Sequence, residues 1–305
     1  MSKVIITGAN GFIGSHVAMR FHELGHEVYG IDIDKGVARP YNTISMNLRS
    51  EQLPQIIQDI QPDIIVHCAG AADVPRSEED PGLDYEINTS LVHHLLTTLA
   101  HLKMTETRFI QLSSAAVYGE PSSLPIKEKA GIHPLSPYAM HKRLAEEICE
   151  FYSIRYGMPI KVLRIFSAYG PGLKKQIFSD MYRKYVRNGC LEMLGTGDES
   201  RDYIYIDDLT HAIVKIALSD NKAFDIINVA SGVETMIKDV ANTFAKAVGL
   251  SPEQVVFSNH NRACDPKNWC ADISKMKEYG CIPNVEIEDG IRRYVDWANK
   301  SYLAD

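Results

Sequence analysis

Residues 3–24 decide the fold. They read Lys3-Val-Ile-Ile-Thr7, then Gly8-Ala-Asn-Gly11-Phe-Ile-Gly14, then a helix-prone run, SHVAMRFHEL. A strand, a glycine-rich turn and a helix in this order are typical of a dinucleotide-binding unit, although the usual spacing is Gly-x-Gly-x-x-Gly. The glycines let the backbone approach a pyrophosphate, which then lies at the helix N-terminus. We therefore expect the cofactor to contact Gly8, Gly11, Phe12, Ile13 and Gly14.

A second apolar strand, Glu27-Val-Tyr-Gly-Ile31, ends at Asp32. A carboxylate at this place accepts hydrogen bonds from the adenosine ribose hydroxyls and repels a 2′-phosphate. The sequence thus favours NAD over NADP. A glycine turn that binds no ligand is the alternative interpretation, which the complete strand–turn–helix–strand unit disfavours.

Strand-like and helix-like runs alternate through the first half of the chain. The strand-like runs are at 4–7, 27–32, 64–69, 108–114 and 160–166. This alternation predicts an α/β fold, a Rossmann-type doubly wound parallel sheet. After residue 170 the pattern is less regular, with helices expected within 178–188, 207–219, 238–248, 273–279 and 287–299. We predict an NAD-binding domain over 1–170 and a smaller C-terminal substrate-binding lobe over 171–305, from which strand 225–229 returns to the first domain.

Composition narrows the functional classes. The chain has 305 residues, 45% of them hydrophobic, and a net charge of −7. Such a chain can bury a large core but has no bulk attraction for nucleic acid or an anionic membrane, so we expect neither as a partner. It has no apolar run long enough for a membrane span and no signal peptide. Its six cysteines form no Cys-x-x-Cys, so we expect a cytoplasmic protein without disulfides or a bound metal.

A second motif, Tyr138-Ala-Met-His-Lys142, lies in a helix-prone run that follows a serine pair, Ser113 and Ser114. The i and i+4 spacing puts Tyr138 and Lys142 on one helix face. An ammonium beside a phenol favours the phenolate, so we expect Lys142 to lower the pKa of Tyr138 from about 10 toward working pH, with a bound nicotinamide cation adding to the shift. Such a tyrosine can move a proton to or from a sugar hydroxyl or a ketone.

Segments along the whole chain carry a family resemblance. They are TGANGFIGSH, VHCAG, EINTS, LSSAAVYGEP, SPYAMHK, LRIFSAYGPG, LGTGDESRDYIYIDDL and DGIRRYVDW. The chain resembles the extended short-chain dehydrogenases/reductases, specifically the NAD-dependent nucleotide-sugar epimerase/dehydratase family that includes UDP-glucose 4-epimerases. The resemblance implies NAD as cofactor, a nucleotide-diphosphate sugar as substrate and a catalytic set of Ser114, Tyr138 and Lys142.

The resemblance also implies binding residues. It assigns further cofactor contacts to Asn47, Leu48, Ala69, Gly70, Ala71, Asn88, Tyr138, Lys142 and Phe166. The nucleotide sugar would contact Val74, Ser114, Ser167, Arg201, Arg262 and Asp265. The chain departs from the family pattern at several places. Ser167 replaces an asparagine, Leu194 an aromatic residue, Trp269 a smaller residue and His141 a serine or threonine, and the run Arg262-Ala-Cys-Asp265 replaces Arg-Pro-Gly-Asp. The base therefore stays open among UDP-, CDP-, GDP- and dTDP-sugars.

The positions after Ser114 discriminate between reactions. Family members that dehydrate or decarboxylate the sugar carry acids there, where this chain has Ala115 and Ala116. The resemblance thus implies a 4-epimerase. A nucleotide-sugar 4-dehydrogenase or 4-keto reductase is the alternative, and a non-catalytic dinucleotide-binding regulator a more remote one. The family also implies a homodimer. Its helices offer apolar candidates that could equally face the chain's own sheet, namely Leu91, Leu95, Leu99, Ile148 and Tyr152.

Overall fold

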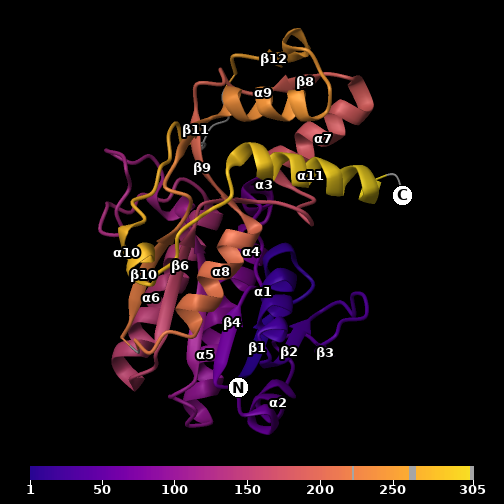
Figure 1. The fold of residues 1–305 in the computed structure, drawn as a ribbon. Coiled ribbons are helices and arrows are strands. Elements are labelled where there is room, and N and C mark those ends of the chain that lie inside the picture. The colour runs from indigo at the N-terminus through magenta and orange to yellow at the C-terminus, as the bar shows by residue number, and fades with distance from the viewer. Residues whose placement is uncertain (222, 261–265, 303–305) are drawn as a thin grey trace.

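A seven-stranded parallel sheet lies at the centre of the computed structural model, which describes residues 1–221, 223–260 and 266–302 (Figure 1). The strand order is β10-β6-β5-β4-β1-β2-β3. The strands are β1 (Lys3–Thr7), β2 (Glu27–Asp32), β3 (Asn42–Ser45), β4 (Ile64–His67), β5 (Arg108–Ser114), β6 (Ile160–Ile165) and β10 (Asp225–Val229). The order reverses between β1 and β4, so the carboxyl ends of these two strands flank the crevice where a doubly wound sheet binds its ligand.

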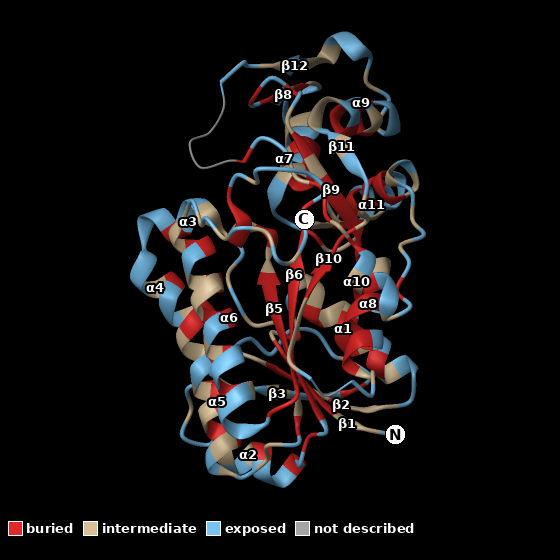
Figure 2. Ribbon diagram, turned by 90° about the vertical axis from the view of Figure 1, so that its left-hand side faces the viewer, coloured by how far each residue is buried: buried red, intermediate tan, exposed pale blue. Residues whose placement is uncertain are grey.

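Helices cover both faces of this sheet (Figure 2). On one face, α1 (Phe12–Glu23) packs against α8 (Ile206–Ala217). The other face carries α2 (Leu53–Ile60), α5 (Leu91–His101) and α6 (Pro137–Tyr156). All six residues of β6 are buried, as expected for a strand covered from both sides. The predicted Rossmann-type sheet is confirmed.

The C-terminal lobe lies beyond one end of the sheet, in the upper part of Figure 1. Its short strands form two further sheets, β11-β9-β7 and β12-β8. They are β7 (Ser167–Tyr169), β8 (Leu191–Met193), β9 (Ser200–Tyr205), β11 (Glu234–Met236) and β12 (Val255–Phe257). The helices of this half besides α8 are α7 (Gln176–Asn188), α9 (Ile237–Ala247), α10 (Ser274–Glu278) and α11 (Ile287–Tyr302).

The two halves of the chain are interleaved. Strand β10 comes from the second half and pairs in parallel with β6, while α8 packs on α1. Conversely, β7 precedes residue 170 and pairs with β9. The division into domains at residue 170 stays a prediction, because elements from each side of it take part in the other half.

A buried polar network fixes α6 against the sheet. The guanidinium of Arg164 on β6 donates two hydrogen bonds, of 2.9 and 2.7 Å, to the carboxylate of Glu146 on α6. Ser113 donates to the same carboxylate at 2.6 Å, and Arg164 also donates to the Tyr118 hydroxyl at 2.9 Å. Removing one partner of such a buried pair costs about 3–5 kcal/mol. The position of α6 is therefore strongly specified.

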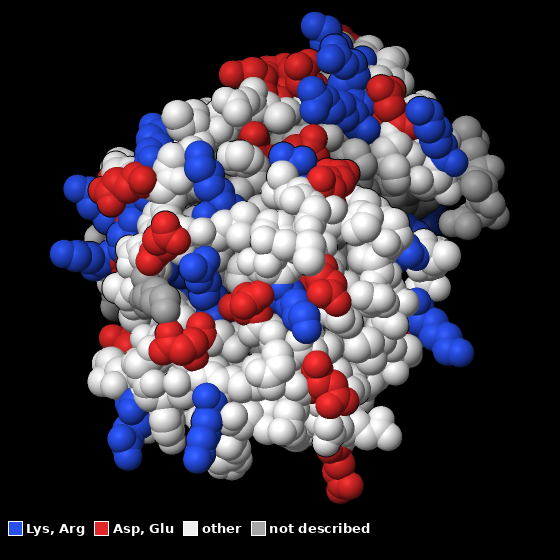
Figure 3. All heavy atoms as spheres, turned by 60° about the horizontal axis from the view of Figure 1, so that its bottom comes forward, with Lys and Arg blue, Asp and Glu red and all other residues white. Residues whose placement is uncertain are grey.

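Acidic and basic side chains alternate over the face of the molecule drawn in Figure 3. The chain has 39 acidic and 32 basic residues, so its net charge of −7 is a small excess of acids over bases. On this face the acids are spread among the bases. None of the described helices is both long enough and apolar enough to cross a bilayer.

Candidate active site

The glycine turn after β1 has a shape that only glycine permits at two positions. Gly8 has φ +65°, and a Cβ on it would lie 2.7 Å from the Ala69 nitrogen. A Cβ on Gly14 would lie 2.1 Å from the Gly8 carbonyl oxygen. The turn therefore lies directly against the end of β4. Helix α1 begins after Gly11 without a side-chain cap, so the first-turn amides of Phe12, Ile13 and Gly14 are available to an anion.

Asp32 lies beside this turn at the end of β2. Its carboxylate accepts a 2.8 Å hydrogen bond from the backbone N–H of Asn10, within the glycine turn. The side chain is half-buried, which leaves oxygen lone pairs for further donors. Asn47 and Leu48 follow β3, the neighbouring strand, where Asn47 is exposed and Leu48 is buried. An acid, a glycine turn and an open helix N-terminus together fit an adenosine dinucleotide.

The segment after β4, Ala69 to Ala71, is held by Asn88. This asparagine lies on a π-helical turn, Glu86–Ser90, and is buried. Its amide oxygen accepts from the Ala71 N–H at 3.2 Å, and its amide nitrogen donates to the Ala71 carbonyl at 3.0 Å. A Cβ on Gly70 would lie 3.0 Å from the Asn88 oxygen and 3.3 Å from Lys142 Nζ. A larger side chain at Gly70 would therefore collide with Asn88 and Lys142, and the small residues of this segment leave room for a ligand.

Ser114, Tyr138 and Lys142 come together at the ends of β5 and α6. Ser136 caps α6 by accepting from the Ala139 N–H at 3.2 Å, and this fixes the start of the helix. The Ser114 hydroxyl lies close enough to the Tyr138 phenol to lower the pKa of that phenol. Lys142 donates to the Leu112 carbonyl at 3.0 Å, and its Nζ lies 5.9 Å from the centroid of the Tyr138 ring. The predicted i, i+4 arrangement is present, and both side chains are 7% exposed.

The predicted effect of Lys142 on the tyrosine is wrong for the protein by itself. Burial raises the pKa of Tyr138 to about 12, the Ser114 hydroxyl lowers it, and the charge of Asp84 raises it. Burial also lowers the pKa of Lys142 to about 8. The ammonium directs its hydrogen bond to the Leu112 carbonyl. Desolvation therefore outweighs the lysine, and the phenol needs a further positive charge to ionise near neutral pH.

The residues predicted to contact substrate lie at different places. Val74 is the first residue of α3 (Val74–Glu79), and its carbonyl accepts a hydrogen bond from the Ser77 hydroxyl. The same hydroxyl accepts a hydrogen bond of 3.2 Å from the backbone N–H of Tyr138. Ser167 is half-buried at the start of β7, next to buried Phe166. Arg201 is half-buried on β9. Arg262 and Asp265 lie outside the described residues.

Trp269 connects the C-terminal lobe to the loop after Ser114. Its indole N–H donates to the Gly119 carbonyl at 3.0 Å, and its ring meets that of Phe166 edge-on at 6.1 Å. The Arg201 guanidinium lies 5.4 Å from the centroid of the same ring and donates to the carbonyls of Ser200 and Lys267. The sequence marked Trp269 only as an unusual residue, and gave no sign of these contacts.

Another contact that the sequence did not reveal joins His141 to Asp84 on α4 (Pro81–Tyr85). His141 Nδ1 lies 2.7 Å from Asp84 Oδ2, and Asp84 Oδ1 accepts from the Asn88 amide at 2.9 Å. The i, i+4 spacing of Asp84 and Asn88 was a usable signal, because it places both on one face of a helical segment. The pairing with His141 was not readable from spacing.

Comparisons with known proteins agree with this geometry. Residues 4–230 match the model of the NAD dependent epimerase/dehydratase family. The chain belongs to this family. It is accordingly an NAD-dependent enzyme, an epimerase or a related oxidoreductase, and the glycine turn, Asp32 and the small residues after β4 fit the cofactor.

Relatives of the family match over nearly the full length. A putative UDP-glucose 4-epimerase of Methanocaldococcus jannaschii is 27% identical over 303 residues, covering 96% of this chain and 97% of the relative. The structure of UDP-glucose 4-epimerase from Thermotoga maritima with UDP-glucose is 26% identical with a TM-score of 0.90, covering 98% and 99% of the two chains. UDP-glucuronic acid 4-epimerase from Bacillus cereus, in complex with UDP-glucuronic acid and NAD, is 28% identical with a TM-score of 0.89 over the same shares.

Proposed function

We propose that this chain is an NAD-dependent nucleotide-sugar 4-epimerase that works through a 4-keto intermediate, with Tyr138 as acid/base. The observation that carries the proposal is the convergence of three side chains: the Ser114 hydroxyl acts on the Tyr138 phenol, and Lys142 lies on the same helix face as Tyr138, beside the segment Ala69–Ala71. The residues after Ser114 are Ala115 and Ala116, which offer no further acid or base. A return of hydride to the other face of C4 needs none.

The chain's own groups divide the work as follows. Tyr138 takes the proton from the 4-hydroxyl and returns it after the ketone has turned over. Ser114 holds the reacting oxygen in line with the phenol. Lys142 keeps an ammonium near the phenolate and offers donors to the nicotinamide ribose. A bound NAD would supply the acceptor and donor for the C4 hydride, and its cationic ring would favour the phenolate that burial alone opposes.

The remaining predicted contacts become proposals for the two ligands. Gly8, Gly11 and the α1 amides hold the pyrophosphate and Asp32 holds the adenosine ribose, with Asn47 and Leu48 toward adenine. On the substrate side, Arg201 contacts the diphosphate, because a guanidinium makes charge-assisted and often bidentate bonds with phosphate. Val74 and Ser167 complete the substrate contacts within the described residues, and Arg262 and Asp265 are proposed from the sequence alone.

The alternative reactions use the same residues. A 4-dehydrogenase or 4-keto reductase would need the same Ser114, Tyr138 and Lys142, but would release its product after one hydride transfer. A regulator that only binds the dinucleotide would need no Tyr138 buried against Ser114. The epimerase is favoured by the relatives that match over nearly the full length, which are 4-epimerases and include one with NAD bound.

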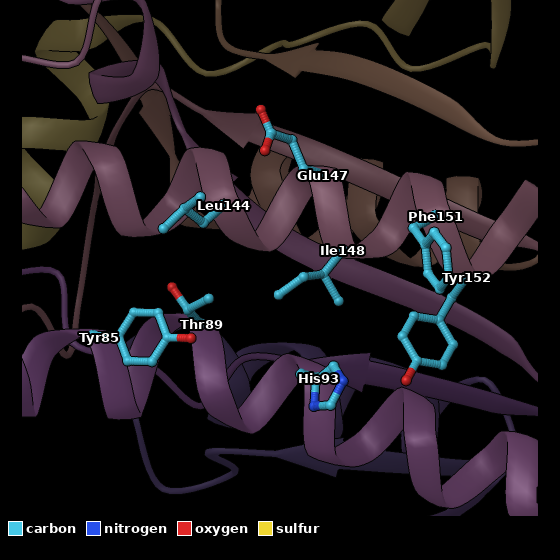
Figure 4. A pocket seen from close by; sticks show the side chains of 8 residues that line it. All are labelled: Tyr85, Thr89, His93, Leu144, Glu147, Ile148, Phe151 and Tyr152. Atoms are coloured by element: carbon cyan, nitrogen blue, oxygen red, sulfur yellow. The ribbon is translucent and has the colours of Figure 1, made fainter.

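The proposed homodimer forms through the groove between α6 and the helix that contains Thr89 and His93 (Figure 4). This groove has a volume of about 300 Å³. Leu144 and Ile148 point into the gap between the two helices, and Glu147 also lines the groove although its carboxylate points away from that gap. The groove is thus mainly apolar and open to the surface, and a second copy of the chain can fill it.

The sequence candidates for this interface separate in the structure. Leu95 and Leu99 are buried in the chain's own core and cannot serve an interface, and partly buried Leu91 packs against that core. Ile148 lines the groove, as does Tyr152, which also belongs to the buried core. Farther along α6, Phe151 is 58% exposed and Ile154 is 78% exposed. Light scattering tests this proposal. A homodimer should have twice the molecular mass of the single chain.

We also propose a cytoplasmic location, on the evidence of the cysteines. Five free cysteines lie among the described residues, and Cys149, Cys270 and Cys281 are buried. Burial raises the pKa of the Cys149 and Cys281 thiols, which makes them unreactive. Unpaired thiols of this kind are typical of a reducing compartment.

The nucleotides released when the purified protein is denatured, with no cofactor added, test the proposed function. We expect NAD or NADH close to one per chain, because an epimerase keeps its cofactor through the ketone stage. The same protein is then assayed with UDP-glucose, UDP-glucuronic acid and CDP-, GDP- and dTDP-sugars. Empty protein that binds NADH or NADPH weakly and consumes it in proportion to product would favour the reductase.

A further inference from the structure

Asp84 and His141 form a buried pair that the proposed chemistry does not use. The two side chains are 4% and 13% exposed, and they meet at 2.7 Å across the contact between α4 and α6. His141 is anchored twice more, since its carbonyl accepts from the Thr89 hydroxyl at 2.8 Å and its ring meets the Tyr85 ring edge-on at 5.5 Å. Through this pair, the turn that contains Asn88 is connected to α6 at His141, the residue directly before Lys142.

The Asp84 carboxylate decides which way the Asn88 amide points. An ionised carboxylate only accepts hydrogen bonds, so the amide nitrogen of Asn88 must face it. The amide oxygen is then left for the Ala71 N–H at 3.2 Å, and the nitrogen also reaches the Ala71 carbonyl at 3.0 Å. A flipped amide would direct an oxygen at the carboxylate and a nitrogen at the N–H. Asp84 excludes that state.

We propose that Asp84 and His141 are positioning residues that lock the Asn88 amide, and with it the Ala69–Ala71 segment, against the helix that carries Tyr138 and Lys142. The chain of contacts runs from His141 through Asp84 and Asn88 to Ala71. This inference rests on the proposed function in one respect, namely that the Ala69–Ala71 segment faces the cofactor. Its consequence is a fixed distance between the cofactor and the acid/base tyrosine.

The Asp84 charge also acts on the acid/base pair. The Asp84 charge raises the pKa of Tyr138, and only burial and Ser114 influence that pKa more strongly. It also raises the pKa of Lys142, on which only burial has a larger effect. The titratable and charged groups around Asp84 come from the region of α3, from α4 and from α6; they are Asp73, Arg76, Asp80, Tyr85, Tyr138, His141 and Lys142. Removing the charge alone therefore lowers the pKa of both Tyr138 and Lys142.

Four variants separate geometry from charge. Asp84→Leu and His141→Leu remove the lock. Asp84→Asn keeps the shape and can still accept from Asn88, and His141→Asn keeps a donor near the position of Nδ1. The matched control is Thr97→Val, which removes the 2.5 Å hydrogen bond between the Thr97 and Tyr152 hydroxyls across α5 and α6, farther from the site.

The NAD content of the purified protein, its affinity for NADH after the nucleotide is removed, and kcat are measured for each variant. We expect both leucine variants to lose about ten- to hundredfold in NADH affinity and kcat, as small misplacements do. The double leucine variant should be no worse than either one, because each breaks the same lock. The asparagine variants should recover most of the affinity, and Asp84→Asn should shift the pH–rate profile to lower pH.

The proposal is overturned if the leucine variants bind NADH and turn over like the parent protein, or if Thr97→Val is equally damaging. Should the leucine variants not fold, the Asp84→Asn variant decides. An unshifted pH–rate profile for this variant would overturn the proposal, and a profile shifted to lower pH would support it. NADH binding is measured without any sugar. A parent protein that binds NADH but epimerises no sugar nucleotide would thus contradict the proposed function, while the variants still test the lock.

Discussion

The side of the site toward the cofactor and the side in the C-terminal lobe differ in how their polar side chains are held. Asn88, Tyr138 and Lys142 are buried. The side chains of Asn88 and Lys142 are hydrogen-bonded to other groups of the first half of the chain, and the Tyr138 backbone N–H donates to Ser77. Arg201, in the lobe, is half-buried, donates to two backbone carbonyls and stacks on Trp269. The residues on the cofactor side are thus held by buried neighbours, whereas Arg201 lies half-buried on a strand of a small sheet.

The difference matches what each side has to do. Proton and hydride transfer need atoms held to within a fraction of an ångström, which buried hydrogen-bonded groups provide. Recognition of a nucleotide sugar needs charge and donors whose identity can change without disturbing the fold. We therefore expect substitutions on the cofactor side to affect kcat and NAD content, and substitutions in the lobe to affect KM.

The sharpest test of the cofactor side is Tyr138→Phe. Removal of the phenolic oxygen should reduce kcat by about two to four orders of magnitude, the usual contribution of a positioned acid/base group. NAD content and thermal stability should stay close to those of the parent protein. Tyr156→Phe, on the exposed end of the same helix, serves as the control and should keep its activity. A near-normal rate for Tyr138→Phe would remove the tyrosine from the mechanism.

A smaller effect on the same side should follow from Gly14→Ala. The new Cβ would lie 2.1 Å from the Gly8 carbonyl oxygen, so backbone has to move. Overpacking of this kind costs about 1–3 kcal/mol of unfolding free energy, and the shifted turn should retain little NAD. In Gly82→Ala the added Cβ meets only Asp80 Oδ1, at 3.5 Å, which makes it a suitable control. If Gly14→Ala purifies with full NAD content, the turn does not hold the pyrophosphate.

The smallest effect should come from the lobe, with Arg201→Ala. Loss of charge-assisted hydrogen bonds from a half-buried arginine should raise KM for the sugar nucleotide by about tenfold. The NAD content and kcat should change little, because Arg201 does not contact the cofactor side. Arg292→Ala, which removes an exposed arginine paired with Asp289 on α11, is the matched control. An Arg201→Ala variant with unchanged KM and lowered kcat would erase the contrast between the two sides.

The sequence predicted best what depends on local spacing. The glycine turn, Asp32 and the i, i+4 pair of Tyr138 and Lys142 are set by neighbours along the chain, and the structure has each in the expected element. The three-residue strands of the lobe were not predicted, because a run so short shows no periodicity. The direction of Leu95 and Leu99 was likewise undecided until their packing was known.

Contacts between distant segments were beyond the sequence. His141 and Asp84 are far apart along the chain, and Trp269 is farther still from Gly119, so no spacing rule joins them. The pKa of Tyr138 was predicted in the wrong direction for the protein by itself, because the degree of burial is a property of the whole fold. Lys142 was expected to dominate, but desolvation does.

The path of the hydride tests the central claim most directly. The purified protein, with no cofactor added, is given its sugar nucleotide with deuterium in place of hydrogen at C4, and the products are analysed by mass spectrometry and NMR. The account predicts that the 4-epimer forms with deuterium still at C4 and that the amount of NADH in solution does not rise. Deuterium in free NADH, with a 4-keto sugar as the released product, would contradict the account and identify a dehydrogenase.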